Sequence, residues 1–195
     1  MDYPTVKSMD GVRQQIELAW SPDSYTWHRI RPGTAFVRNS PKSKREYGTM
    51  PYDWGAMFPS QPVFPENEVQ IFYGASDWYF FDWRKSGLAM ATLRPDGWAG
   101  YEPSDKKKRA AVSTAPIVCT GDQLRVSADI QNNGWLKVTM LNKYGTFLAS
   151  SQAMTGTGTD VVVKWENDFA LTSGESVRLR FEFSQAKLYS FSFGG

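Results

Sequence analysis

Val177-Arg178-Leu179-Arg180-Phe181-Glu182-Phe183 is the stretch that decides the fold class. Apolar and charged residues alternate in it strictly, as in a β-strand with one buried face, because successive side chains of a strand point to opposite faces. The same period of two recurs at 124–130, 136–140, 161–165 and 189–193, with turn-forming residues between the runs. About six or seven such strands predict an antiparallel β-sandwich, because a sheet with a full apolar face needs a second sheet to cover it.

The first hundred residues are also β-rich, but their composition is different. Aromatic residues make up 15% of the chain, and six of the eight tryptophans precede residue 100. Two segments match each other, Leu18 to Asp23 and Ala91 to Asp96; each is a strand running into a Pro-Asp turn, and an aromatic strand follows. We expect Asp23 and Asp96 to bond the backbone of their own turns. The tryptophans of the two hairpins, Trp20, Trp27 and Trp98, are expected in the core.

These hairpins resemble the outer strands of blades in the five-bladed β-propeller glycoside hydrolases, the invertase-like and arabinanase-like group. Asp53 to Phe58, with Pro62-Val63, is similar to the loop and inner strand that begin the next blade, and Val69 to Ala75 is similar to its second strand. Gly87 to Trp98 is similar to its outer hairpin, and the C-terminal half is similar to the β-sandwich of uncharacterised members of the group.

The resemblance implies an all-β chain with a partial propeller of about one and a half blades followed by an antiparallel sandwich. The partial propeller would span 1–103, a linker 104–110 and the sandwich 111–195. The resemblance also implies that the family's catalytic carboxylates belong to earlier blades. We therefore assign no catalytic residue and lean against an enzyme.

A candidate sugar site lies where carboxylates and aromatic residues adjoin. Aromatic rings bind the apolar faces of sugars, and neighbouring charged groups bind their hydroxyls. Spacing alone cannot establish the two carboxyl groups, about 5 to 9.5 Å apart, that glycoside hydrolysis needs. An alternative is that the aromatics only cover the end of the propeller-like unit or its contact with the sandwich. The expected platforms are Trp54, Trp78 and Tyr79, and the expected polar anchors are Asp53, Asp77 and Arg84.

Charge and composition narrow the remaining classes. A net charge of +2 is too small for a nucleic-acid partner, and no apolar run is long enough for a membrane span. A single cysteine, Cys119, and a single histidine, His28, give no metal site, and no cofactor is expected. His28 is expected on the surface. The compartment is left open.

Three functions are compatible with these observations. The leading hypothesis is a carbohydrate-binding or accessory module whose partner is an oligo- or polysaccharide. The second is a structural or assembly module that self-associates or pairs through an exposed blade edge, because unpaired strand edges recruit other strands. The third is an intact glycosidase.

Overall fold

The computed structural model describes residues 13–41, 50–79 and 85–194, and within these ranges the chain is all-β without a helix. The strands form three antiparallel sheets, none of them closed. The expected all-β class is therefore confirmed. Two compact units make up the chain, Met1–Arg94 and Pro95–Gly195, which we call unit 1 and unit 2. The division falls after Arg94, whereas the sequence placed a linker at 104–110.

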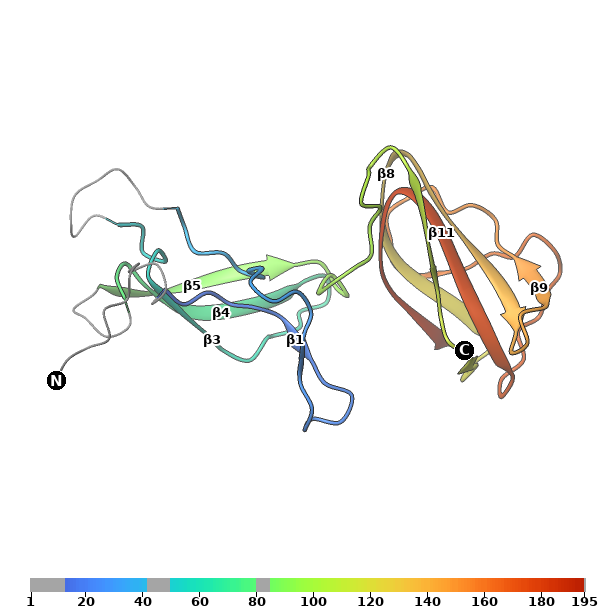
Figure 1. Ribbon diagram of the computed structural model, residues 1–195, viewed down its shortest axis with the longest axis horizontal. Helices are drawn as coiled ribbons and strands as arrows, with labels where there is room; N and C mark the ends of the chain where they lie inside the picture. Colours follow the sequence, from blue (N-terminus) through green and yellow to red (C-terminus); the bar gives the residue numbers. More distant parts are fainter. Residues whose placement is uncertain (1–12, 42–49, 80–84, 195) are drawn as a thin grey trace. The chain divides into compact units, whose positions relative to one another are not determined.

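Unit 1 contains a short hairpin and a three-stranded sheet (Figure 1). The hairpin pairs β1 (Ala19–Trp20) with β2 (His28–Arg29). The sheet is a meander in chain order of β3 (Ala56–Pro59), β4 (Val69–Ser76) and β5 (Ser86–Leu93). Every second residue of β4 from Val69 onward is buried, so one face of the sheet points into a core.

The core of unit 1 is small and lies on one face of the sheet. Ile16, Met57, Tyr73 and Ala75 form it. The segments 13–17 and 34–39 lie over this face and are tied together by an antiparallel bridge from Ile16 to Val37. On the opposite face Phe58, Leu88 and Met90 are exposed by 49%, 77% and 49%. The sheet therefore has one covered and one open face among the described residues.

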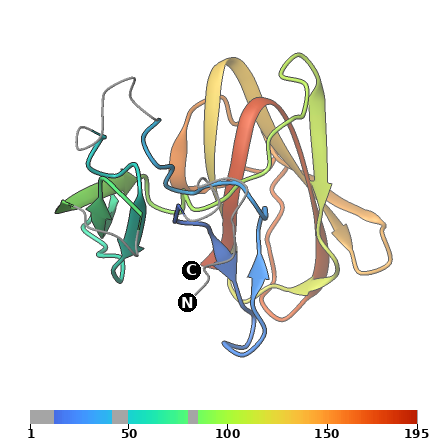
Figure 2. The same ribbon diagram turned by 60° about the vertical axis from the view of Figure 1, so that its left-hand side comes forward.

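The β1–β2 hairpin corrects one expectation. Trp20 and Trp27 are 52% and 63% exposed, so they do not belong to a core. The hairpin projects from the rest of unit 1 (Figure 2), so its aromatic side chains keep more than half of their surface exposed. His28 is exposed, as expected, and its ring lies 5.3 Å from the ring of Trp20.

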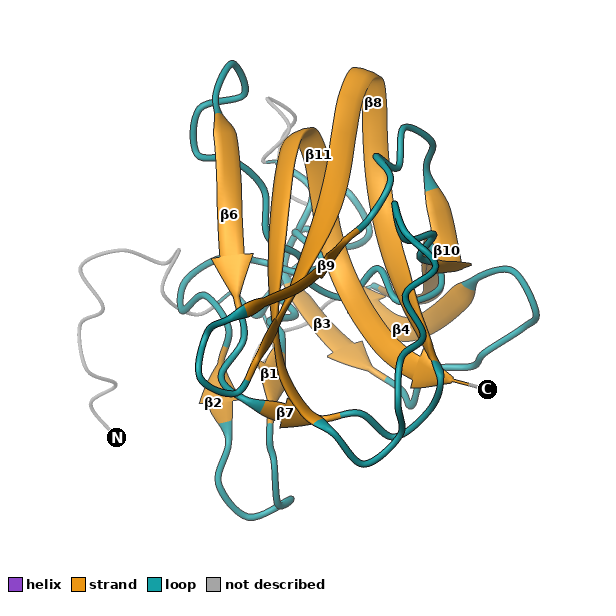
Figure 3. Cartoon of the chain, turned by 90° about the vertical axis from the view of Figure 1, so that its right-hand side faces the viewer, coloured by secondary structure: helices purple, strands orange, loops and turns teal. Residues whose placement is uncertain are grey.

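Unit 2 is built around two long strands (Figure 3). The sheet order is β10-β8-β11-β6, with β7 pairing at β11 and β9 pairing at β8. The six strands are β6 (Arg109–Ser113), β7 (Ile117–Val118), β8 (Gln123–Asn142), β9 (Phe147–Ser150), β10 (Gly158–Val162) and β11 (Ser176–Gly194).

Strands β8 and β11 pair along nearly their whole length and bend together halfway (Figure 3). The bend contains Asn133 and Gln185, both in the left-handed backbone region with φ of 64° and 47°. Apolar residues of both halves fill one core, and Val177, Leu179, Phe181 and Phe183 are all at most 1% exposed. The period of two therefore places the core side chains of 124–130, 136–140 and 177–183 correctly, whereas in the run 161–165 Val163 is buried but Val161 is 38% exposed.

The chain enters unit 2 through a segment held by side-chain and backbone bonds. The carboxylate of Asp96 accepts hydrogen bonds from the hydroxyls of Ser127 at 2.8 Å and Ser190 at 3.0 Å. Tyr101 pairs with Leu188 through two backbone hydrogen bonds of 2.8 and 3.0 Å. Asp96 thus departs from the expectation of a self-bonded turn, because the sheet of unit 2 brings two serine hydroxyls to its carboxylate.

Candidate functional site

Three of the predicted site residues form one aromatic cluster in unit 1. The ring of Trp54 lies 5.5 Å from that of Trp78 and 5.3 Å from that of Tyr79, and Trp78 and Tyr79 are 5.0 Å apart. They meet because Trp54 precedes β3 and the other two follow β4, and these strand ends pair at Ala56 and Ser76. We call Trp54, Trp78 and Tyr79 the aromatic cluster.

Gly55 allows the two sides of this cluster to approach. A Cβ atom at this position would lie 1.8 Å from the carbonyl oxygen of Trp78, so no larger residue fits there without a backbone shift. The amide of Gly55 also donates to the carbonyl of Ser76 at 2.9 Å. The Trp54-Gly55 pair therefore fixes the distance between the ends of β3 and β4.

The burial of the cluster defines what it can do. Trp54 is 2% exposed and Tyr79 4%, whereas Trp78 is partly exposed. Rings as buried as Trp54 and Tyr79 cannot also lie against a sugar, because their faces are already covered by protein. Trp54 and Tyr79 are thus packing residues of unit 1, whereas Trp78 keeps part of its surface exposed.

The predicted polar anchors separate. Asp53 is 6% exposed, and its Oδ1 has no hydrogen-bond partner. Asp77 is a loop residue whose Oδ1 accepts from the amide of Lys85 at 2.8 Å, while its own amide donates to the Lys85 carbonyl at 3.1 Å. Arg84 lies outside the described residues.

The charge of Asp53 acts on a neighbouring tyrosine. Burial raises the pKa of Tyr73 to about 12, and a hydrogen bond with Tyr52 and the negative charge of Asp53 act in the same direction. Asp53 therefore lies next to a phenol that stays protonated at neutral pH.

Arg13 and Asn39 connect the aromatic cluster to the overlying segments. The guanidinium of Arg13 lies 4.7 Å from the centre of the Trp54 ring, and its Nε donates to the Trp54 carbonyl at 2.8 Å. The buried amide of Asn39 donates to the carbonyls of Gln14 and Asp53, both at 3.0 Å. Segments 13–17 and 34–39 are thereby anchored to the loop that precedes β3.

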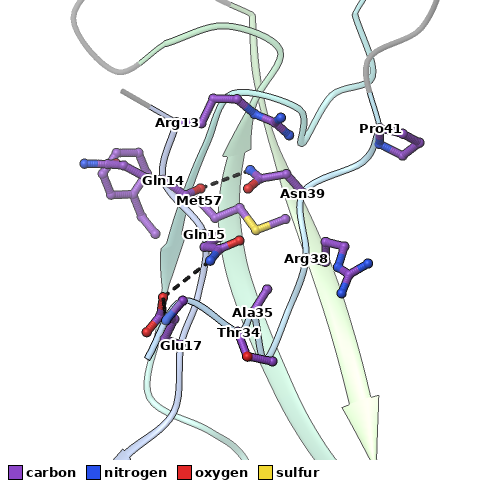
Figure 4. A pocket seen from close by; sticks show the side chains of 12 residues that line it. Arg13, Gln14, Gln15, Glu17, Thr34, Ala35, Arg38, Asn39, Pro41 and Met57 are labelled. Carbon is purple, nitrogen blue, oxygen red and sulfur yellow. Dashed lines mark hydrogen bonds between the residues drawn. The ribbon is translucent and has the colours of Figure 1, made fainter. Parts of the chain in front are cut away.

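A pocket of about 1090 Å³ lies between these two segments. Figure 4 shows side chains of residues 13–17 on one side and residues 34–41 on the other, with the thioether of Met57 between them. Most of the longer side chains are guanidinium or amide groups. We call this the polar pocket; the residues that give its chemistry are Arg13, Gln14, Gln15, Glu17, Arg38 and Asn39.

Glu17 is the one carboxylate among the residues that line the polar pocket. It accepts hydrogen bonds from the guanidinium of Arg29, from Nε2 of Gln15 at 3.4 Å and from the amide of Gly33 at 3.2 Å. The hydrogen bond from Arg29 is the main cause of a lowered pKa at Glu17. Glu17 therefore stays ionised at neutral pH and acts as an acceptor.

Sequence reasoning missed the residues that line the pocket. These residues, Arg13, Gln14, Gln15, Arg38 and Asn39, match no motif. The one available signal is that planar hydrogen-bonding side chains flank Ile16, the buried residue of the first segment. That signal identifies a strand as readily as a site.

Comparison of the chain with protein-family models, with curated proteins and with solved structures gave no match. The described part of the chain contains no helix that could span a membrane. Among the same residues, no group of three or more His, Cys, Asp or Glu side chains is arranged to hold a metal ion. The function is therefore argued from the site alone.

Proposed function

We propose that the chain binds carbohydrate through the polar pocket and does not hydrolyse it. The observation that carries this proposal is the set of guanidinium, amide and carboxylate groups that lines the pocket in unit 1. Such planar groups donate and accept paired hydrogen bonds, as adjacent sugar hydroxyls require. Trp54 holds the guanidinium of Arg13, and three backbone carbonyls hold the amide of Asn39.

The exposed hairpin supplies the aromatic part of the proposed site. Glu17 lies two residues before β1, so the pocket and the hairpin belong to one continuous stretch of chain. Trp20 and Trp27 are more than half exposed, and Tyr25 is 91% exposed. A longer oligosaccharide would place one ring in the pocket and another against the hairpin, because aromatic faces pack on the apolar faces of sugars.

The electrostatics support binding without catalysis. Hydrolysis requires one carboxyl group that gives a proton and another that attacks or activates water. Glu17 is held ionised by Arg29, so it cannot serve as the acid at neutral pH. The buried Asp53 is covered by protein rather than lining the pocket.

The same proposal includes the finer description of the fold. The β3-β4-β5 meander is the arrangement that three consecutive strands of a propeller blade have, and the β1–β2 hairpin corresponds to the outer part of a preceding blade. In unit 2, the two halves of the bent β8–β11 pair share one core, as the two layers of a sandwich do.

A titration with neutral and acidic oligosaccharides, followed by calorimetry and tryptophan fluorescence, tests the binding. We expect Arg38→Ala to lower the affinity for the tightest-binding oligosaccharide about tenfold, which is equivalent to about 1.4 kcal/mol of binding free energy. Arg31→Ala is the matched control, because Arg31 is exposed and does not line the pocket. The proposal is overturned if no oligosaccharide of the panel binds, or if the two variants bind with equal affinity.

A second candidate function, self-association, is favoured by β5. This edge strand is eight residues long, contains no charged residue or proline, and pairs on only one side with a described strand. Natural edge strands usually carry such residues to prevent pairing. An uncharged strand can pair antiparallel with β5 of a second copy without opposing like charges, and this would extend the open apolar face of Phe58, Leu88 and Met90.

Sedimentation over a range of protein concentrations tests this pairing. A dimer that is lost in Leu88→Lys but kept in Tyr144→Lys supports it. Tyr144 is the control because it is 82% exposed in a turn of unit 2, so it gains the same charge away from β5. A monomer at every concentration removes the candidate.

A further inference from the structure

A second pocket, of about 140 Å³, lies on unit 2 where β8 and β11 bend. β8 contributes Asp129 and Gln131, and β11 contributes Gln185, Lys187 and Tyr189. The third wall, which includes Glu102, comes from the segment that enters unit 2. The pocket thus joins three stretches of chain that are far apart in the sequence.

The pocket lies at an irregularity in the backbone of β11, where the two strands bend. The register of β11 against β8 shifts between Ser184 and Ala186, and the residue between them, Gln185, has a φ of 47°. Opposite it, a Cβ atom on Gly134 would lie 2.6 Å from the Gln185 carbonyl, so the two strands approach closely there. Bulges and left-handed residues other than glycine re-aim side chains and gather at functional sites.

The third wall is fixed by the pairing of Tyr101 with Leu188. Gly100 makes the approach close, because a Cβ atom there would lie 2.7 Å from the carbonyl of Leu188. Glu102 is then held beside β11, and its carboxylate lies 3.6 Å from the Lys187 ammonium. Pro103 is buried and lines the pocket with an apolar surface.

The lining combines the groups that a sugar requires. The hydroxyl of Tyr189 donates to Oδ2 of Asp129 at 2.7 Å, which holds the phenol ring at the pocket. The Lys187 ammonium lies 5.9 Å from the centre of that ring. Gln131 and Gln185 add both donors and acceptors. Two acidic residues, Glu102 and Asp129, balance two basic residues, Lys106 and Lys187.

We infer that this unit 2 pocket binds a single neutral sugar residue, either a monosaccharide or the end of a chain. Balanced charges favour a neutral ligand over an anionic one, because an anionic ligand would lie close to the two carboxylates of the pocket and be repelled by them. The volume of about 140 Å³ is well below the roughly 300 to 1,000 Å³ of pockets that enclose larger ligands, so it does not hold several sugar rings. The site is distinct from the polar pocket of unit 1 and does not require it.

Amide chemical shifts of the full chain, titrated with glucose, galactose, xylose, N-acetylglucosamine and galacturonate, test the inference. We expect a neutral sugar to shift the amides of 129–131 and 185–189 saturably. Gln131→Ala should weaken this binding by about tenfold, the effect of one lost ligand hydrogen bond. Gln152→Ala is the matched control, because Gln152 is exposed and lies outside the pocket.

The unit 1 variant Arg38→Ala separates this inference from the proposed function. Binding that is unchanged in Arg38→Ala and is weakened about tenfold in Gln131→Ala supports a second site. Shifts confined to 13–17 and 34–39 leave the polar pocket standing and overturn the inference. A preference for galacturonate over galactose at 129–131 also overturns it, since it contradicts the charge argument.

Discussion

Asp23 and Asp96 follow proline in matching turns, yet their carboxylates have different partners. Oδ1 of Asp23 accepts from the amides of Tyr25 at 2.9 Å and Thr26 at 2.7 Å, which confirms the expected turn. Asp96 instead bonds two serines of unit 2. The local sequence specifies the turn in both places, but the partner of the carboxylate depends on which sheet lies beside it.

The role of Asp96 predicts a loss of stability in Asp96→Ala. The change leaves the buried hydroxyl of Ser127 without its carboxylate acceptor, and hydrogen bonds to charged groups contribute about 1.5 to 3 kcal/mol each. We expect the free energy of unfolding of unit 2 to fall by about 1 to 3 kcal/mol, measured by urea denaturation. Asp122→Ala changes an exposed turn residue and should have no effect. An equal free energy of unfolding in the two variants would contradict the prediction.

Tyr73 predicts a pH dependence at the alkaline end. Its pKa is raised to about 12 in the folded state by burial, whereas in the unfolded chain it stays near 10. Above the unfolded pKa the unfolded state loses a proton that the folded state keeps, so stability falls as the pH rises through this window. Relative to Tyr73→Phe, the wild type should lose stability between these two values in chemical denaturation. Parallel curves would show that the phenol has no such shift.

At the scale of elements, β8 shows that the alternation of residues predicts the core positions but not where a strand ends. The alternation at 124–130 and 136–140 places Leu124, Val126, Leu136 and Val138 in the core, as the structure does. The intervening Asn-Asn-Gly at 132–134 predicts a turn between separate strands, whereas the chain continues as one bent strand. The period of two is identical in both cases, and only the long partner β11 decides between them.

Gly134→Ala tests the bend. An added methyl group would overlap the Gln185 carbonyl, which is backbone and cannot rotate away. Overpacking of this kind costs about 1 to 3 kcal/mol, so the thermal midpoint of unit 2 should fall. Gly156→Ala is the control, since a Cβ atom there would meet nothing within 4 Å. An unchanged midpoint in Gly134→Ala would show that the bend relaxes without cost.

The candidate site was only partly predictable from the sequence, because it depends on contacts between segments that are distant along the chain. The adjacency of carboxylates and aromatic residues in the sequence identified Asp53, Trp54, Trp78 and Tyr79, and the structure places them at the paired ends of β3 and β4. The sequence could not show that Trp54 is buried and Trp20 exposed, because the burial of a side chain depends on which part of the sheet a second layer covers. The pocket residues carry no motif, because they come from two separate segments of the sequence. These segments meet only in the fold, through the Ile16–Val37 bridge and hydrogen bonds such as that from Asn39 to Gln14.

At the scale of the whole molecule, each unit has its own core. The core of unit 2 draws its residues from Cys119 to Leu188, and that of unit 1 from Ile16 to Ala75. Among the described residues, every strand pairing lies within one unit or the other. A unit that buries its own apolar residues and pairs its own strands meets the conditions for independent folding.

The fragment 95–195 is therefore expected to fold alone and to be more stable than 104–195. The shorter fragment loses the serine bonds of Asp96 and the backbone pairing of Tyr101 with Leu188. Cys119 reports the difference: it is 1% exposed, and burial raises the pKa of its thiol, so alkylation requires unit 2 to open. We expect native-state alkylation to be about tenfold or more faster in 104–195, which corresponds to about 1.4 kcal/mol of opening free energy. Equal rates would place the boundary of the folding unit at the 104–110 segment, because residues 95–103 would then add nothing to its stability.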